Sequence, residues 1–175
     1  ARNAGLIACA AAGLSFAASV WAFFSLLGLE VSARSVHQTL YTWISAGDFV
    51  VRASFLFDPR SAVMSLVVTG VGFIIHVYSI GYMREDPGRT RYFAYLNLFL
   101  FAMLILVLAD NFLVLFVGWE GVGLCSYLLI GFWFEKKSAT DAGKKAFIVN
   151  RIGDFGFAIA VFLIFSTFGT LDYAG

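Results

Sequence analysis

The sequence predicts an all-α fold: a polytopic bundle of about five transmembrane helices in a single membrane domain. Hydrophobic residues make up 61% of the 175-residue chain and charged residues only 13%, whereas a soluble globular domain has about 45–50% and about 25%. The apolar residues form continuous runs rather than the alternating pattern of a transmembrane β-barrel. These observations exclude a soluble globular enzyme, a disordered tail and a nucleic-acid-binding protein, and they predict a chain that lies in a lipid bilayer.

Each predicted helix rests on one long apolar stretch. A helix rises about 1.5 Å per residue, so about 20 apolar residues are needed to cross the hydrocarbon core. The stretches of that length are residues 6–29, 61–83, 92–109, 111–134 and 146–168. The first follows Arg2 and has some features of a signal peptide, but it is longer than the apolar region of about 7–15 residues that signal peptides carry. We therefore expect a retained helix.

The segments between the spans carry cap and turn signals. Asp58 and Pro59 predict the start of the second span, with the aspartate as N-cap and the proline in the first turn. Asp110 and Asn111 leave only a tight turn between the third and fourth spans, and either residue is a candidate cap of the fourth. Residues 30–57 are too polar for a span, so we expect an extramembrane loop or an amphipathic surface segment there.

The basic residues predict the orientation of the chain. Cytoplasmic loops carry an excess of Lys and Arg, and an inside amino terminus places eight of the twelve basic residues on the inner side. We therefore expect the amino terminus inside and the carboxyl end outside. The inner set is Arg2, Arg84, Arg89, Arg91, Lys136, Lys137, Lys144 and Lys145, and the outer set is Arg34, Arg52 and Arg60.

The chain shows no signal for a cofactor or metal of its own. Cys9 and Cys125 lie in predicted spans and outside any CxxC pair, so we expect buried free thiols. No iron–sulfur or zinc spacing occurs. A haem held by two histidines is not supported, because His76 is in a span but His37 is in the long loop. We therefore expect no metal, no cofactor and no redox centre in this chain.

Glu120 is the first candidate site residue, because it lies near the centre of the fourth span. An ionised group at that depth costs roughly 2.5–3.5 kcal/mol on insertion scales. The carboxylate must therefore face a partner, a water-filled cavity or the bundle interior, or else bind a proton. The alternative interpretation is a structural carboxyl that is hydrogen-bonded between helices, while Gly121 and Cys125 allow another helix to approach closely.

The fifth span supplies candidate partners for Glu120. Lys144, Arg151 and Asp154 are spaced at i, i+7 and i+10, which places them along one side of a helix. Arg151 and Asp154 are expected to pair, and Arg151 lies too deep to reach the interface. Lys144 and Lys145 are lower-ranked candidates, since a lysine pair at a helix end usually extends to the interface. Such strings of charge near the midplane are typical of a proton or ion path.

His76 is a further candidate of lower rank. It lies in the inner half of the second span, and its imidazole titrates in a range that suits proton relay. The alternative is a histidine that is simply hydrogen-bonded inside the bundle.

Three segments of the chain resemble a known family. The string from Asp110 to Trp133, with Gly-Trp-Glu-Gly-Val-Gly over 118–123, resembles the antiporter-like subunits of respiratory complex I. It is most similar to the largest of them, subunit L in bacteria and subunit 5 in mitochondria. Residues 57–83 and 145–156 agree with the same family. The resemblance covers most of the chain from about residue 55 onward.

The resemblance implies roles for the candidate residues. Glu120 matches the family's proposed proton-translocating glutamate, and Arg151 and Asp154 match residues near its proton path. The family's principal partner of that glutamate, a lysine on a later broken helix, has no counterpart here. The family also begins with one more helix than this chain. We therefore expect an amino-terminal fragment of a longer subunit, or one product of a split gene.

The function implied is proton translocation as a membrane-arm subunit of NADH–quinone oxidoreductase, in a bacterial cytoplasmic or mitochondrial inner membrane. NADH, FMN, iron–sulfur clusters and quinone are expected in partner subunits. The expected partners are the other membrane-arm subunits, the lipid bilayer and the remainder of the same subunit, with no nucleic acid. The alternatives are the large subunit of a multisubunit cation/proton antiporter, a related proton-pumping assembly, and a non-pumping structural helix bundle.

Overall fold

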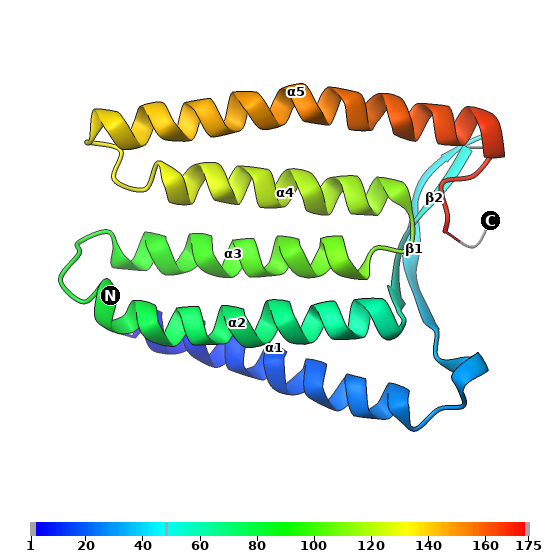
Figure 1. The fold of residues 1–175 in the computed structure, drawn as a ribbon, viewed down its shortest axis with the longest axis horizontal. Coiled ribbons are helices and arrows are strands. Elements are labelled where there is room, and N and C mark those ends of the chain that lie inside the picture. The colour runs from blue at the N-terminus through cyan, green and yellow to red at the C-terminus, as the bar shows by residue number, and fades with distance from the viewer. Residues whose placement is uncertain (1–2, 48, 174–175) are drawn as a thin grey trace.

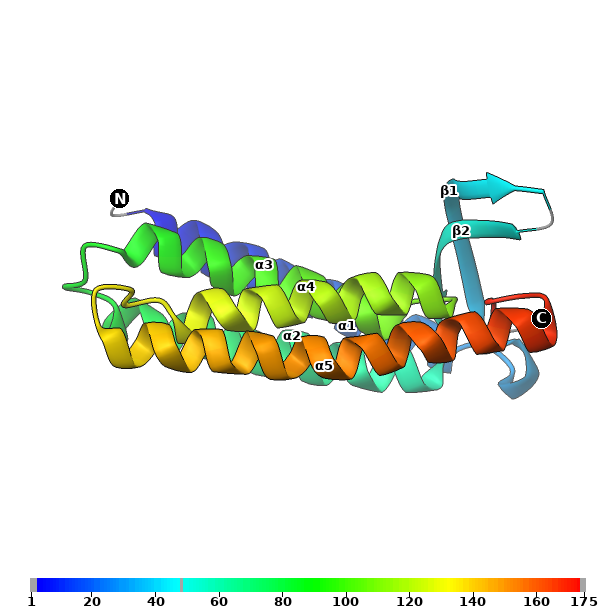
Figure 2. The ribbon, with the colours of Figure 1, turned by 90° about the horizontal axis from the view of Figure 1, so that it is seen from above.

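A computed structural model describes residues 3–47 and 49–173, which form long helices and one β-hairpin (Figures 1 and 2). The helices are α1 Ala4–Leu27, α2 Pro59–Tyr82, α3 Arg89–Leu108, α4 Phe112–Ile130 and α5 Lys137–Phe168, with a short 3-10 turn, η1, at Val31–Ala33. The hairpin consists of β1 Val36–Ala46 and β2 Phe49–Phe57. In this part of the chain, five helices are long and apolar enough to cross a membrane. The all-α bundle and the multi-pass membrane location are thereby confirmed.

The helices lie side by side with alternating direction. In Figure 1, α2, α3, α4 and α5 follow one another, and α1 packs against α2 and α3. The hairpin and residues 169–173 lie at one end of the bundle, whereas the turns at 83–88 and 131–136 lie at the other (Figures 1 and 2). The described members of the predicted inner and outer basic sets therefore lie at opposite ends. Arg2 lies outside the described residues, and which end faces inside stays a prediction.

Two span boundaries differ from the sequence prediction by four residues or more. The fifth helix begins at Lys137 rather than at residue 146. Its first turns are polar but helical, and Lys137 pairs with Asp141 one turn later at 2.7 Å. The prediction followed only the apolar part of the helix. The fourth helix ends at Ile130 rather than at residue 134, because the backbone leaves the helical path at Gly131.

The expectation of a loop or amphipathic segment over residues 30–57 was wrong, because most of it forms an antiparallel hairpin. Val36 pairs with Phe57 and Ala46 with Phe49, and the register shifts between Thr39 and Tyr41 and between Thr42 and Ile44. β1 is exposed along nearly its whole length, so its sequence lacks the alternation of apolar and polar residues that would predict a strand. Gly47, at a φ of +60°, supplies the left-handed backbone of the turn.

The predicted helix caps are confirmed. The carboxylate of Asp58 accepts a 2.8 Å hydrogen bond from the Ser61 backbone N–H, and Ser61 Oγ accepts one of 2.7 Å from the Asp58 N–H. Pro59 follows at the first helical position. Of the two candidate caps of α4, Asn111 fills the position and accepts from the Val114 N–H at 2.9 Å. Asp110 therefore does not cap α4.

Candidate functional site

Glycines on α4 bring that helix against α3 and leave Glu120 free to face α5. A Cβ at Gly118 would lie 2.5 Å from the backbone N of Leu106, and one at Gly121 would lie 3.0 Å from Ala102 Cβ. Only glycine permits the first of these approaches, because the obstacle is backbone. The close helix contact predicted for this stretch is present. Glu120 lies between the two glycines in sequence but contacts the opposite neighbour.

Arg151 lies between two carboxylates. Its Nη1 forms an ion pair with Glu120 Oε2 across the α4–α5 contact, and the same nitrogen is 3.6 Å from Asp154 Oδ2 on its own helix. The sequence offered Asp154 and Glu120 as alternative counter-ions of Arg151, and the structure brings both to it. With both carboxylates ionised, these three side chains carry a net charge of −1, and one bound proton makes them neutral.

Asp154 is the most enclosed member of this group. Its side chain is 9% exposed, against 22% for Glu120 and 43% for Arg151. Its second oxygen, Oδ1, accepts a 2.7 Å hydrogen bond from Trp119 Nε1. Both oxygens of the buried carboxylate are therefore engaged, as a buried charge requires. We call Trp119, Glu120, Arg151 and Asp154 the Arg151 cluster.

Trp119 is the member of the cluster that sequence reasoning missed. It was seen only as a flank of Glu120, yet the two neighbours on α4 contact residues three apart on α5. The indole of a tryptophan has one polar atom, the Nε1 donor, which needs an acceptor when it is buried. This need was the only signal in the sequence that could have indicated the contact. Its ring also packs edge-on against Phe157 at 6.2 Å.

An aromatic ring lies against the guanidinium of the cluster. The guanidinium of Arg151 lies over the ring of Phe147 one turn earlier, with 4.6 Å between Cζ and the ring centroid. This cation–π contact stabilises a charge that the membrane otherwise penalises.

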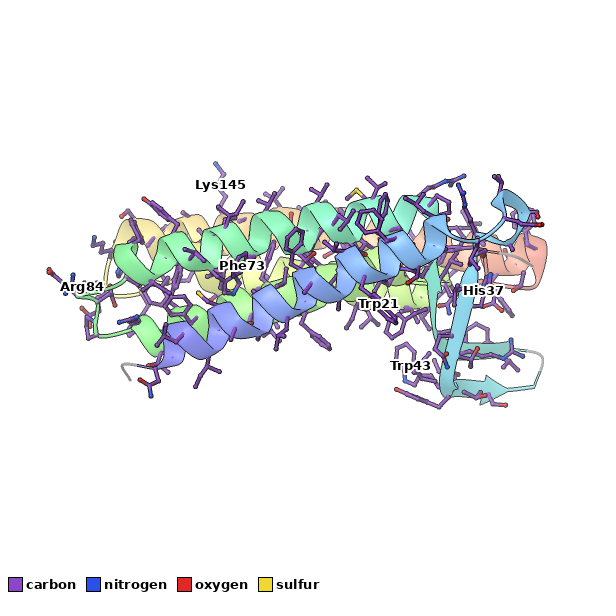
Figure 3. All side chains as sticks on the ribbon, turned by 90° about the horizontal axis from the view of Figure 1, so that it is seen from below. Trp21, His37, Trp43, Phe73, Arg84 and Lys145 are labelled. Atoms are coloured by element: carbon purple, nitrogen blue, oxygen red, sulfur yellow. The ribbon has the colours of Figure 1, made fainter. Side chains whose placement is uncertain are left out.

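The lysine candidates lie away from the cluster. Lys144 and Lys145 are exposed on α5, and Lys145 points away from the bundle (Figure 3). Neither forms an ion pair with another residue that the structure describes. Helical spacing placed Lys144 on the same side as Arg151, but Arg151 itself is partly exposed and reaches α4 through its long side chain.

His76 is fully buried on α2, and no hydrogen bond or ion pair joins it to the cluster. Its Nδ1 lies 2.7 Å from the Gly72 carbonyl oxygen, while Nε2 has no partner among the described residues. The imidazole lines an otherwise apolar cavity of about 290 Å³ between α2, α3 and Leu129 of α4. One turn further on, the buried Ser79 hydroxyl lies 3.3 Å from the Tyr92 hydroxyl.

Residues 3–47 and 49–173 hold no group of three or more His, Cys, Asp or Glu side chains placed to bind a metal ion. Cys9 and Cys125 are both free and buried, as predicted.

Comparison with known proteins identifies the family. Residues 43–93 match the family model described as NADH-ubiquinone oxidoreductase (complex I), chain 5 N-terminus. Residues 109–174, which include α4 and α5, match the one described as NADH:quinone oxidoreductase/Mrp antiporter, TM. NADH-quinone oxidoreductase subunit L of Mycobacterium tuberculosis is 54% identical over 97% of this chain, and that of Escherichia coli is 46% identical over 91%. The chain belongs to the family of antiporter-like membrane subunits that includes subunit L of complex I.

The resemblance seen in the sequence is thereby confirmed, and it extends to solved structures. A structure of the Mrp complex from Dietzia sp. DQ12-45-1b superposes with a TM-score of 0.82 at 27% identity, over 99% of this chain and 18% of that chain. This antiporter-like chain spans about a quarter of the length of its curated relatives, covering 27% of the Mycobacterium tuberculosis protein and 26% of the Escherichia coli protein.

Proposed function

We propose that this chain is part of a proton-translocating membrane-arm subunit of NADH–quinone oxidoreductase and that Glu120 carries the proton. The observation that supports this most directly is the Arg151 cluster, in which one guanidinium serves two intramembrane carboxylates. Intramembrane ionisable groups are expensive and are usually functional. The subunit L relatives supply the biological setting.

The geometry favours Glu120 over Asp154 as the proton carrier. Trp119 donates a hydrogen bond to Asp154, and Trp119 has no acceptor that could bind a protonated acid in return. Asp154 is thus matched to its ionised form, whereas Glu120 has Arg151 as its counter-ion and is the more exposed of the two. An arriving proton binds Glu120, the ion pair with Arg151 is lost, and Arg151 keeps Asp154 as its partner. Loss of the proton restores the pair.

We propose that the other candidate residues assist this proton exchange without binding the transported proton at Glu120. Lys144 and Lys145 lie on α5 between the cluster and the end that carries the described basic turns, where they would hold positive charge near the cluster's inner side. His76 would relay protons near the Ser79 and Tyr92 hydroxyls, since its Nε2 has no hydrogen-bond partner among the described residues.

The driving reaction is proposed to take place elsewhere in the complex. NADH, FMN, iron–sulfur clusters and quinone would be bound by partner subunits, and the neighbours of this chain would be other membrane-arm subunits, lipid and the rest of its own subunit. The membrane would be a bacterial cytoplasmic or a mitochondrial inner membrane.

The test is Glu120→Gln in the full-length subunit, within the assembled complex in sealed vesicles. Gln keeps the shape and removes the exchangeable carboxyl proton, so protons pumped per NADH oxidised should fall sharply or to zero. Asp141→Asn is the matched control, because Asp141 is an exposed acid that pairs only with Lys137 in this part of the chain. Full pumping stoichiometry in Glu120→Gln would refute the proposal and favour a non-pumping structural role.

A second candidate function is that of a large subunit in a multisubunit cation/proton antiporter. It is favoured by the likeness to the Mrp structure and by the family model that names both groups. The two candidates differ in their partners and their energy source. Copurification with iron–sulfur subunits and NADH-driven pumping support the first, whereas sodium-dependent proton exchange without NADH supports the second.

A further inference from the structure

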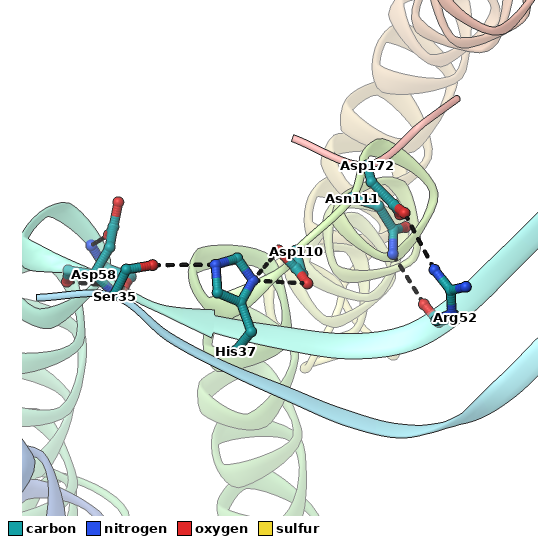
Figure 4. Close-up of polar contacts among 8 residues, drawn as sticks. Ser35, His37, Arg52, Asp58, Asp110, Asn111 and Asp172 are labelled. Carbon is teal, nitrogen blue, oxygen red and sulfur yellow. Dashed lines mark hydrogen bonds and ion pairs between the residues drawn. The ribbon is translucent and has the colours of Figure 1, made fainter. Parts of the chain in front are cut away.

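Three segments that are distant in sequence meet at the hairpin end of the bundle (Figure 4). They are the α3–α4 turn at Asp110 and Asn111, the hairpin, and the segment 170–173 that follows α5. The Phe112 N–H donates to the Leu171 carbonyl at 3.0 Å, and the Tyr173 N–H donates to the Asp110 carbonyl at 3.2 Å. We call this meeting point the hairpin junction.

The second strand is joined to the junction by backbone and apolar contacts. Phe55 forms an isolated bridge with Ala109, and Asn111 Nδ2 donates to the Arg52 carbonyl at 2.9 Å. Val51 packs with Val161 and Leu171 in a buried apolar cluster. The first strand packs chiefly on the second, and its Ile44 lies against the same apolar cluster. Its polar connection to the turn is made by His37.

His37 lies against the carboxylate of Asp110, as Figure 4 shows. The distances from His37 Nδ1 to Asp110 Oδ1 and Oδ2 are 3.2 and 3.3 Å. The other ring nitrogen, Nε2, lies 3.1 Å from the hydroxyl of Ser35. This hydroxyl donates to Nε2 when the imidazole is neutral, and by rotation it accepts from Nε2 when the imidazole is charged. Both charge states are therefore fully hydrogen-bonded.

The exposure of the pair suits exchange of protons with water. The His37 side chain is 46% exposed, whereas that of Asp110 is 15% exposed. Water reaches the imidazole directly, while the carboxylate is held mostly under the hairpin. A proton on the imidazole converts the hydrogen bond into an ion pair, which is the stronger of the two contacts.

The other charged groups at the hairpin junction do not compete for this proton. Arg52 on β2 is paired with Asp172, with 3.6 Å between Nη1 and Oδ2. Burial, and secondarily the nearby Asp110 carboxylate, raise the pKa of Tyr173 to about 12, so its phenol stays neutral at physiological pH. Asp58 is engaged as the cap of α2. The charge that faces His37 is therefore that of Asp110.

We propose that His37 and Asp110 form a proton-binding site at the hairpin end of the bundle, and that proton binding there strengthens the attachment of β1 to the α3–α4 turn. The ligand is a proton from the aqueous phase on that side of the membrane. The contact is an ion pair only while the imidazole carries its second proton. The contact is therefore stronger in acid, where the imidazole gains this proton, than in alkali. The site does not depend on the proposed function of Glu120.

The test is amide hydrogen exchange of β1 in the full-length subunit, within its assembled complex in lipid nanodiscs. Rates at pD 5.5 and 8.0 are compared after correction for the intrinsic pH dependence of exchange. We expect β1 amides to be about 2- to 5-fold more protected at pD 5.5, the range for one partly exposed ion pair. His37→Gln and Asp110→Asn should each abolish this ratio.

His76→Gln is the matched control, because it removes the other histidine of the chain at a site remote from the hairpin, and it should keep the ratio. Arg52→Gln should also keep it, because the Arg52–Asp172 pair involves no imidazole. The ratio is taken within each variant, so a general loosening of the hairpin by one substitution cancels. A ratio near one in the unaltered protein, or a ratio that survives His37→Gln, would overturn the proposal whatever the outcome for proton pumping.

Discussion

Trp119 Nε1 donates a 2.7 Å hydrogen bond to Asp154 Oδ1 and so joins α4 to α5 beside the ion pair of Arg151 and Glu120. The two consecutive residues on α4 therefore each contact α5. The tryptophan holds one carboxylate in place, while the glutamate shares the guanidinium. In the proposed mechanism, Asp154 stays ionised while Glu120 exchanges its proton.

Trp119→Phe should impair proton pumping while leaving the helices packed. Phenylalanine keeps most of the ring contact with Phe157 but removes the only donor of the indole. A hydrogen bond to a charged group contributes about 1.5–3 kcal/mol, so Asp154 should no longer be held ionised as firmly, and protons pumped per NADH should fall. Trp133→Phe is the matched control, since Trp133 Nε1 donates to Asp86 at an exposed turn. Equal pumping by both variants would remove Trp119 from the mechanism.

Arg151→Ala should abolish coupling more severely than Arg151→Lys. Alanine leaves two neighbouring carboxylates inside a span without a cation, where an unpaired charge is costly. Lysine restores a single charge but not the planar group that lies over Phe147. Pumping in assembled complexes should follow the order Arg, Lys, Ala. If the alanine variant fails to assemble, the lysine variant is decisive. Wild-type coupling in Arg151→Lys would mean that the site needs only a positive charge. Failed assembly of both variants would assign Arg151 a structural role.

The sequence predicted the bundle and the charges of the cluster for one physical reason: the membrane penalises polarity. Long apolar runs indicated the spans. Glu120, Arg151 and Asp154 were recognised because a charge inside a span is costly. The same reasoning could not predict the hairpin, since β1 is exposed on both faces and shows no alternation of apolar and polar residues. It also began the fifth span too late, at residue 146, because the turns from Lys137 onward are helical but polar.

The finer contacts of the site depend on helix rotation, which a single apolar sequence leaves open. A helix with apolar residues all around gives no preferred face, so spacing placed Lys144 beside Arg151 on the helix surface but could not say which neighbour they face. The indole of Trp119 reaches Asp154 because Gly118 and Gly121 turn the opposite face of α4 toward α3. That choice of face is set by packing across three helices.

Gly118→Ala should destabilise the contact between α3 and α4. The added methyl would lie 2.5 Å from the Leu106 backbone N, and so the helices must move apart. Overpacking of this kind costs typically about 1–3 kcal/mol. Thermal unfolding in detergent should show a lower midpoint for Gly118→Ala. Gly153→Ala on α5 is the matched control, because nothing lies within 4 Å of its added methyl, and its midpoint should be unchanged or slightly higher. The same midpoint for both variants would contradict the close approach.

Asn111→Ala should destabilise the hairpin junction, because one completely buried side chain there makes two hydrogen bonds. Its Oδ1 accepts from the Val114 N–H and caps α4, while its Nδ2 donates to the Arg52 carbonyl on β2. Loss of the cap alone costs about 0.5–2 kcal/mol, and the Arg52 carbonyl loses a partner as well.

Asn111→Asp separates the two effects, since the carboxylate keeps the cap and loses the donor. Asn3→Ala is the control, because Asn3 begins α1 without a side-chain cap bond. Amide exchange in the first turn of α4 should rise in Asn111→Ala and stay low in Asn111→Asp, while exchange in β2 should rise in both. Unchanged exchange in β2 in the two Asn111 variants would show that the hairpin is held to the bundle without this residue.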